Sequence, residues 1–237
     1  NIIYFNWIMK KVLCIIPARL GSKSIKNKNI FKFKGKELIY YSIRFANSLK
    51  FINKTIFSSD SIKYLNIAKK YGSKNNYLRP KIYSSDFAKT ISLVKYLLKE
   101  ELKKGLKYNF VLILQPTSPF RKVSDFSKAF NLLKQKKYDT VITISESSEH
   151  PMRMKILNKN NLVKNYIKLN AESLTPRQKL SKVYIRAGSM YFIKVKSLIK
   201  NNSLVGKKVF GIKVKNQYSL NIDTKKDIIL AKHYFND

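Results

Sequence analysis

A basic segment follows an apolar run near the start of the chain, within the stretch IIPARLGSKSIKNKNI at residues 15–30. Its cations are Arg19, Lys23, Lys26 and Lys28. Arginine presents a fork of donors and lysine a point charge, and both bind phosphate groups. The segment follows neither of the glycine-rich patterns G-x-x-x-x-G-K-[ST] and G-x-G-x-x-G. Its chemistry predicts an anion site, and a solvated lysine-rich loop is the alternative.

The whole chain is strongly basic. A net charge of +36, taken alone, points to nucleic acid or to an anionic membrane surface. The excess is mostly lysine, spread along the chain and accompanied by many Asn, Ile, Tyr and Phe residues. Because all of these have A- or T-rich codons, we favour a compositional bias over specific nucleic-acid binding. Hydrophobic residues make up 44% of the sequence, which is enough for a folded core.

The cysteine content and the apolar runs indicate the cellular compartment of the protein. Cys14 is the single cysteine, so no disulfide can form within the chain and a reducing compartment, the cytoplasm, is expected. No run of about 18 apolar residues occurs, so we expect no membrane partner. The opening NIIYFNWIM lacks a basic region and makes a poor signal peptide. We expect residues 1–8 to be an extension and residues 9–237 to form a single domain.

Strand-like and helix-like patterns alternate through the first part of the chain. Short apolar runs predict strands at 11–16, 54–59, 109–115 and 139–145. Apolar residues at helical spacing predict helices at 37–49, 61–72, 90–102 and 123–135. Such alternation predicts an α/β fold with a parallel sheet and helices on both faces.

The alternation stops in a polar segment, at about residues 146–186, which reads as an inserted flap. Strands are expected again at 183–195 and 209–214, and a last helix at 224–235. Ligands of parallel sheets bind at the carboxyl ends of the strands. The basic segment, Asp60 and the motif QPTSP at 115–119 each follow a predicted strand, so we expect them to share one crevice.

Five blocks of the sequence resemble the acylneuraminate cytidylyltransferases, also called CMP-sialic acid synthetases. The basic segment resembles the signature A-R-x-G-S-K-x-x-x-x-K-N, and LQPTSPFR at 114–121 resembles L-Q-P-T-S-P-L-R. The other blocks are LRPKIYSSDFAKT at 78–90, PRQKLSKVYIRAGSMY at 176–191 and SLNIDTKKD at 219–227. They occur in the family's order and span most of the chain.

The resemblance implies a nucleotidyltransferase that joins CTP to a 2-keto sugar acid, giving a CMP-sugar and pyrophosphate for surface glycans. It implies a Rossmann-like α/β fold with a mostly parallel sheet, Mg²⁺ as cofactor, and a homodimer formed by the segment at about 146–186. Sialic, legionaminic, pseudaminic and related acids remain open as substrates. The alternatives are a basic nucleic-acid-binding protein on a nucleotidyltransferase scaffold and a catalytically impaired family member.

The resemblance also implies roles for residues around the nucleotide. Arg19 and Lys28 would bind the phosphates and act in catalysis. Their loop would be supported by Ser22, Lys23 and Asn29. Cytidine and its ribose would be bound by Arg79, Asp86 and Thr90.

The sugar acid would contact two further blocks. Gln115 would bind the sugar, and Arg121 would close the loop that carries it. Arg177 and Gln178 would bind the substrate carboxylate, either in their own chain or in a partner. Arg153 or Lys155 could share that task.

The last block carries the implied metal ligands. Asp223 is the expected Mg²⁺ ligand and a catalytic residue, since Mg²⁺ is held by one or two carboxylates together with substrate phosphates. Asn221 is the second expected ligand, although it stands where the family's D-I-D has its first aspartate. An amide oxygen ligates without charge, and Asp60 or Asp86 is the alternative second ligand. A second departure is Ala187, where the family motif N-G-A-I-Y has asparagine.

Overall fold

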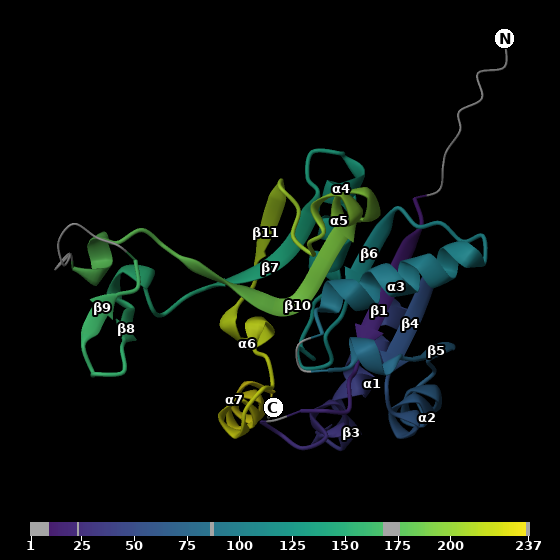
Figure 1. Cartoon of the computed structure of the whole chain (residues 1–237), viewed down its shortest axis with the longest axis horizontal. Helices are drawn as coiled ribbons and strands as arrows, with labels where there is room; N and C mark the ends of the chain where they lie inside the picture. The colour runs from purple at the N-terminus through teal and green to yellow at the C-terminus, as the bar shows by residue number, and fades with distance from the viewer. Residues whose placement is uncertain (1–9, 23, 86–87, 168–175, 236–237) are drawn as a thin grey trace, which may run out of the picture.

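The fold is that of a computed structural model, which describes residues 10–22, 24–85, 88–167 and 176–235 (Figure 1). Its centre is a sheet of seven strands in the order β11-β7-β10-β6-β1-β4-β5. The strands are β1 (Val12–Pro17), β4 (Lys54–Ser59), β5 (Asn75–Leu78), β6 (Phe110–Ile113), β7 (Thr140–Glu146), β10 (Tyr184–Lys194) and β11 (Val209–Lys213). The predicted extension at residues 1–8 lies outside the described residues.

Most neighbouring strands are parallel, which confirms the predicted fold class. β1 pairs in parallel with β4 and β6, β4 with β5, and β7 with β11. β10 is the exception, since it runs antiparallel to both β6 and β7. It enters the sheet directly after the segment predicted to be an insertion, without the crossover helix that a parallel neighbour requires.

Helices cover both faces of the sheet. They are α1 (Leu38–Ser48), α2 (Ile62–Lys70), α3 (Thr90–Lys103), α4 (Val123–Lys134), α5 (Val195–Asn201), α6 (Asn216–Ser219) and α7 (Lys225–Phe235). Successive side chains of β1 point to opposite faces. Its residues Val12, Cys14 and Ile16 pack in one core with α1, α2 and α4, and Leu13 and Ile15 pack in the other with α3 and α5. The apolar run of β1 is therefore continuous because both its faces are buried.

Short elements extend from this body. A hairpin of β2 (Lys32–Phe33) and β3 (Lys36–Glu37) follows the basic segment. A second hairpin, β8 (Lys155–Leu157) with β9 (Val163–Asn165), projects far from the sheet at the end of the extended β7 and β10 strands (Figure 1). Among the described residues, no helix combines the length and the apolar character needed to cross a membrane.

Candidate functional site

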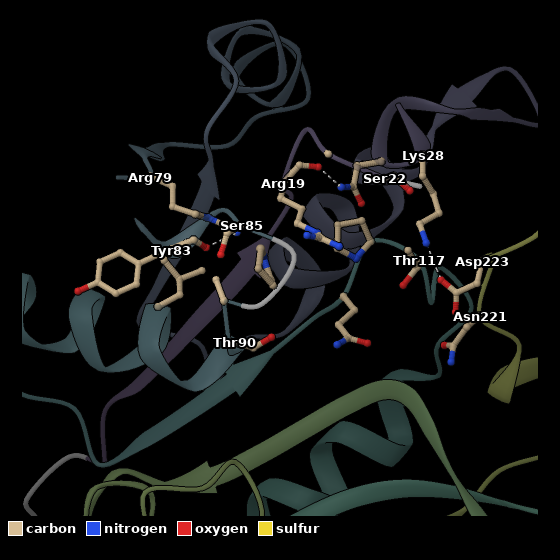
Figure 2. Close-up of a pocket in the computed structure, with 17 residues that line it drawn as sticks. Arg19, Ser22, Lys28, Arg79, Tyr83, Ser85, Thr90, Thr117, Asn221 and Asp223 are labelled. Carbon is tan, nitrogen blue, oxygen red and sulfur yellow. Dashed lines mark hydrogen bonds and ion pairs between the residues drawn. The ribbon is translucent and has the colours of Figure 1, made fainter. Parts of the chain in front are cut away.

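A cavity of about 400 Å³ lies where the parallel strands end (Figure 2). β1 ends at Pro17 beside it, Arg79 follows β5, and Gln115 follows β6. Its polar lining comprises Arg19, Ser22, Lys28, Asn29, Arg79, Ser85, Thr90, Gln115, Thr117, Asn221 and Asp223. The structure thus brings together blocks that are spread over the whole sequence, as the arrangement of a parallel sheet predicts.

Hydrogen bonds to the backbone hold the basic segment at this edge. Asp60 follows β4, and its Oδ1 accepts a bond of 2.8 Å from the backbone N–H of Leu20. Asn29 is buried, and its Nδ2 donates to the carbonyl of Arg19 at 2.8 Å. Asp60 therefore supports the loop and does not line the cavity, while Asn29 fixes the turn that carries Arg19 and Lys28.

Lys28 and Asp223 lie side by side at one side of the cavity and point toward each other (Figure 2). Lys28 Nζ donates to Asp223 Oδ1 at 2.7 Å. The Lys28 side chain is 16% exposed and that of Asp223 is 53% exposed, so solvent still reaches the carboxylate. One carboxylate and two cations of the basic segment thereby line the same space.

Arg79 lies deep on the opposite side of the cavity. Its Nη2 donates to the carbonyl of Ser58 at 2.9 Å and its Nη1 to the carbonyl of Tyr83 at 3.4 Å. Within the described part of the chain, its buried Nε–H has no acceptor. Burial lowers the pKa of Arg79 to about 10; nearby Asp60 opposes that shift and Arg19 adds to it. The guanidinium remains a cation at neutral pH, and its Nε–H is left to donate to a ligand.

A glycine lies close to three polar side chains, two of which, Gln115 and Asn221, line the cavity. A Cβ atom on Gly188 would lie 2.7 Å from Asn221 Oδ1 and Ser118 Oγ, and 2.8 Å from Gln115 Oε1. Ser118 Oγ itself donates to Asn221 Oδ1 at 2.5 Å. Gly188 sits at the irregularity in the pairing of β10 with β7. Our sequence analysis did not single out Gly188 or Ser118, although a glycine inside a strand often marks a close approach.

Arg121 closes the loop behind Gln115. It is partly buried, and it donates to the carbonyls of Gln115 (2.7 Å) and Ser189 (3.0 Å) and to Ser42 Oγ (3.2 Å). Burial lowers the pKa of Arg121 to about 9. These three bonds tie the loop to α1 and β10, and they fix the backbone of Gln115 from behind.

Some predicted site residues lie elsewhere. Lys23, Asp86 and the side chain of Arg177 lie outside the described residues. Gln178 lines a different cavity of about 380 Å³ at the base of the projecting hairpin, together with Glu146 and His150. The structure therefore does not bring Gln178 to Gln115 within one chain.

The sequence that forms this cavity matches a known protein family. The family model described as "Cytidylyltransferase" covers residues 13–234. The chain belongs to the cytidylyltransferase family. The family resemblance drawn from the sequence blocks is thereby confirmed, and with it the assignment as a nucleotidyltransferase.

Curated relatives are about 30% identical to this chain over the aligned residues. The post-translational flagellin modification protein B of Campylobacter coli is 31% identical over 225 residues, which cover 94% of each chain. The pseudaminic acid cytidylyltransferase of Campylobacter jejuni is 31% identical over 222 residues, covering 94% of this chain and 95% of that protein. The N-acylneuraminate cytidylyltransferase of Streptococcus agalactiae serotype V is 30% identical over 231 residues, 96% of this chain. The chain spans 54% of that streptococcal protein's length.

Solved structures show the same fold at lower identity. CMP:2-keto-3-deoxy-manno-octonic acid synthetase complexed with CTP has a TM-score of 0.63 at 15% identity, covering 94% of this chain and 100% of that one. A 4-diphosphocytidyl-2C-methyl-D-erythritol synthase has a TM-score of 0.66 at 10% identity, covering 94% of this chain and 97% of that one. The architecture is therefore that of a nucleotidyltransferase.

Proposed function

We propose that this protein activates a nine-carbon 2-keto sugar acid with CTP, releasing pyrophosphate and a CMP-sugar for surface glycan synthesis in the cytoplasm. The observation that carries the proposal is that one cavity is lined by the cations Arg19, Lys28 and Arg79 and by the Asp223 carboxylate. Membership of the cytidylyltransferase family supports the nucleotide. The names of its relatives, which include pseudaminic acid and N-acylneuraminate cytidylyltransferases, support the class of acceptor.

The reaction needs positive charge at the triphosphate. The anomeric hydroxyl of the sugar acid would attack the α-phosphorus of CTP, and the bond to the β-phosphate oxygen would break. Pyrophosphate leaves with the electron pair, so fixed cations at that end lower the barrier. We assign this task to Arg19 and Lys28, and the supporting of their loop to Ser22, Lys23 and Asn29.

Cytidine would bind at the other end of the cavity, between Arg79 and the start of α3 at Thr90. Cytosine carries two adjacent acceptors, O2 and N3, whereas uracil has a donor at N3. The Nε–H of Arg79 has no acceptor among the described residues, and it favours a base that accepts there. Asp86 remains our prediction for the ribose.

A divalent metal fits beside Asp223. The carboxylate already holds the ammonium group of Lys28 at 2.7 Å, so the position accommodates a cation. No group of three or more His, Cys, Asp or Glu residues that could hold a metal exists in the described ranges. We therefore propose that Asp223 holds Mg²⁺ jointly with the substrate phosphates, where the ion supplies positive charge. Asn221 Oδ1 accepts from Ser118 and keeps a second lone pair, so it can serve as the other protein ligand.

The sugar acid would lie beside Gln115, with the Gln115 amide as its polar contact. Arg177 and Gln178 lie between the projecting hairpin and β10, and they would reach the carboxylate from a second copy of this chain, because Gln178 lines a different cavity in its own chain. The hairpin region exposes Met154, Ile156, Leu157, Leu162, Val163, Tyr166 and Ile185. Burying such a surface between two copies stabilises a dimer, so we propose a homodimer.

Pyrophosphate release tests the proposal. The purified protein is incubated with Mg²⁺, each of the four nucleoside triphosphates, and a panel of sialic, legionaminic and pseudaminic acids. Release with CTP and one acid confirms the reaction and identifies the acid. Arg19→Ala is expected to lower turnover about a hundredfold, the cost of losing one electrostatic stabiliser. Absence of release with every pair, together with equal binding of all four nucleotides, would reject the proposal.

A further inference from the structure

Asp227 stands at the start of α7 and binds the turn that carries Asp223. Its Oδ2 accepts three hydrogen bonds, from the N–H of Asp223 (3.0 Å), the N–H of Thr224 (2.6 Å) and the hydroxyl of Thr224 (2.9 Å). In return, the N–H of Asp227 donates to Thr224 Oγ1 at 3.4 Å. Thr224 and Asp227 thus form a reciprocal cap, in which each side chain satisfies a backbone N–H at the helix start.

One of these hydrogen bonds, from the N–H of Asp223 to Asp227 Oδ2, does not cap the helix. A helix leaves its own first N–H groups unsatisfied, and capping Thr224 serves them. The N–H of Asp223 precedes the cap, so its bond to Asp227 stabilises the position of Asp223 and not the helix.

Two further segments hold the same turn. Ser24 Oγ donates to the carbonyl of Asp223 at 2.5 Å. The N–H of Ile222 donates to the carbonyl of Thr117 at 2.7 Å. The backbone of Asp223 is therefore tied to the basic segment, to the loop after β6 and, through Asp227, to α7. The main chain that carries the half-exposed Asp223 carboxylate is thus held in place before any ligand binds, and the Lys28 ammonium contacts the carboxylate itself.

We propose that Asp227 is a positioning residue that fixes the Asp223 carboxylate opposite Lys28, ready for a metal ion and the substrate phosphates. This role rests on the function proposed above. Asp227 does not line the cavity, so it acts through Asp223. Its loss should weaken metal binding without touching the nucleotide contacts of Arg19 and Arg79.

Mn²⁺ is a direct probe of this role, because its binding is measured by electron paramagnetic resonance without turnover. Wild-type protein and Asp227→Ala are titrated with Mn²⁺ in the presence of CTP and without sugar acid. CTP binding in EDTA is measured separately by calorimetry. We expect Asp227→Ala to raise the Mn²⁺ dissociation constant about tenfold or more, the usual cost of losing a group that orients a metal ligand. CTP binding in EDTA should stay unchanged.

Two further variants separate positioning from helix capping. Thr224→Ala removes the two hydrogen bonds that the Thr224 hydroxyl makes with Asp227 and leaves the bond between Asp223 and Asp227, so its Mn²⁺ affinity should stay near that of the wild type. Asp125→Ala removes the acidic residue in the first turn of α4, away from the cavity, and should leave Mn²⁺ and CTP binding unchanged. If Asp227→Ala does not fold, Asp227→Asn replaces it, since the amide keeps one acceptor oxygen, and an intermediate loss is expected.

The outcomes distinguish this inference from the proposed function. Equal Mn²⁺ affinity of Asp227→Ala and wild type, or an equal loss in Thr224→Ala, overturns the positioning role and leaves the function intact. Wild-type protein that binds neither CTP nor Mn²⁺ overturns both. A selective loss of Mn²⁺ affinity in the Asp227 variants supports both.

Discussion

Lys28 Nζ and Asp223 Oδ1 lie 2.7 Å apart, although 195 residues separate them in sequence. The pair links the first of the five sequence blocks to the last. It marks the place where the substrate phosphates, the metal ion and the Lys28 ammonium group would meet. Binding of a metal and CTP would replace each residue's present partner, giving Asp223 to the metal and Lys28 to a phosphate. Because of this exchange, turnover should be sensitive to substitution of either residue.

Removing the charge of Lys28 should impair chemistry. Lys28→Met is expected to lower kcat about a hundredfold, since one electrostatic stabiliser of the leaving group is lost. Steady-state pyrophosphate release with saturating CTP measures the effect. Lys26→Met is the matched control, because Lys26 is exposed and does not line the cavity. Equal activities of the two variants would contradict the role of Lys28.

Restoring a carboxylate at residue 221 should strengthen metal binding. Asn221→Asp adds a second negative charge beside Asp223, and we expect the Mg²⁺ concentration at half-maximal activity to fall about tenfold. A sharp rise in turnover at saturating Mg²⁺ would further identify the natural protein as an impaired family member. An unchanged Mg²⁺ dependence would remove residue 221 from the metal site.

A side chain on Gly188 should damage the sugar site selectively. In Gly188→Ala the new Cβ would lie within 2.8 Å of Gln115, Ser118 and Asn221, so those side chains must move. We expect the KM for the sugar acid to rise about tenfold, while CTP binding measured in EDTA, without the metal that Asn221 would hold, is retained. Gly206→Ala is the control, since its Cβ would lie 2.6 Å from Asp139 away from the cavity. It should lower stability and leave the KM unchanged.

A buried ion pair between β4 and α3 should make stability depend on pH. Glu101 is buried, and it accepts from Lys54 Nζ at 2.7 Å and from Tyr108 at 3.1 Å. Burial raises the pKa of Glu101, but the bonds from Lys54 and Lys104 outweigh it and hold the pKa below the ordinary value. Because the folded-state pKa is depressed, the stabilisation is complete above the unfolded pKa of about 4.3 and is lost as the pH falls through the lower folded value.

Urea unfolding at several pH values tests this pair. Glu101→Gln leaves Lys54 without its charge partner and should cost about 3 kcal/mol at pH 7, with a weaker dependence on acid pH. Glu100→Gln on the same helix should have no measurable effect, because the Glu100 pair with Lys103 is on the surface. A similar loss of unfolding free energy in both variants would show that a general effect on the helix, and not the buried ion pair, causes the destabilisation.

The projecting hairpin should hold two copies together. Leu157→Glu and Val163→Glu place charge on opposite strands of this exposed hairpin and should convert the proposed dimer into a monomer. Light scattering measures the mass, and calorimetry should show that CTP still binds. Lys159→Glu on the connecting turn is the control and should leave the mass unchanged. A wild-type protein that is already monomeric would contradict the homodimer.

Local patterns predicted most of the elements. The apolar run before Pro17 indicated β1, and helical spacing indicated α1 to α4 within a few residues of their observed ends. The edge strand β5 was not predicted, because Asn75–Leu78 is polar and only partly buried. An edge strand has a neighbour on one side only, so its side chains need not be apolar and the local signal is weak.

The sequence by itself determined the alternation of strands and helices, the blocks that resemble cytidylyltransferases and the residue types available for phosphate binding. These depend on local periodicity and on side-chain chemistry, which can be read along the chain. Only the tertiary structure decided which residues meet: the pairing of Lys28 with Asp223, the contact of Gly188 with Gln115 and Asn221, and the three bonds of Arg121. Such contacts arise when strands distant in sequence become neighbours in one sheet, and no local pattern encodes their distances.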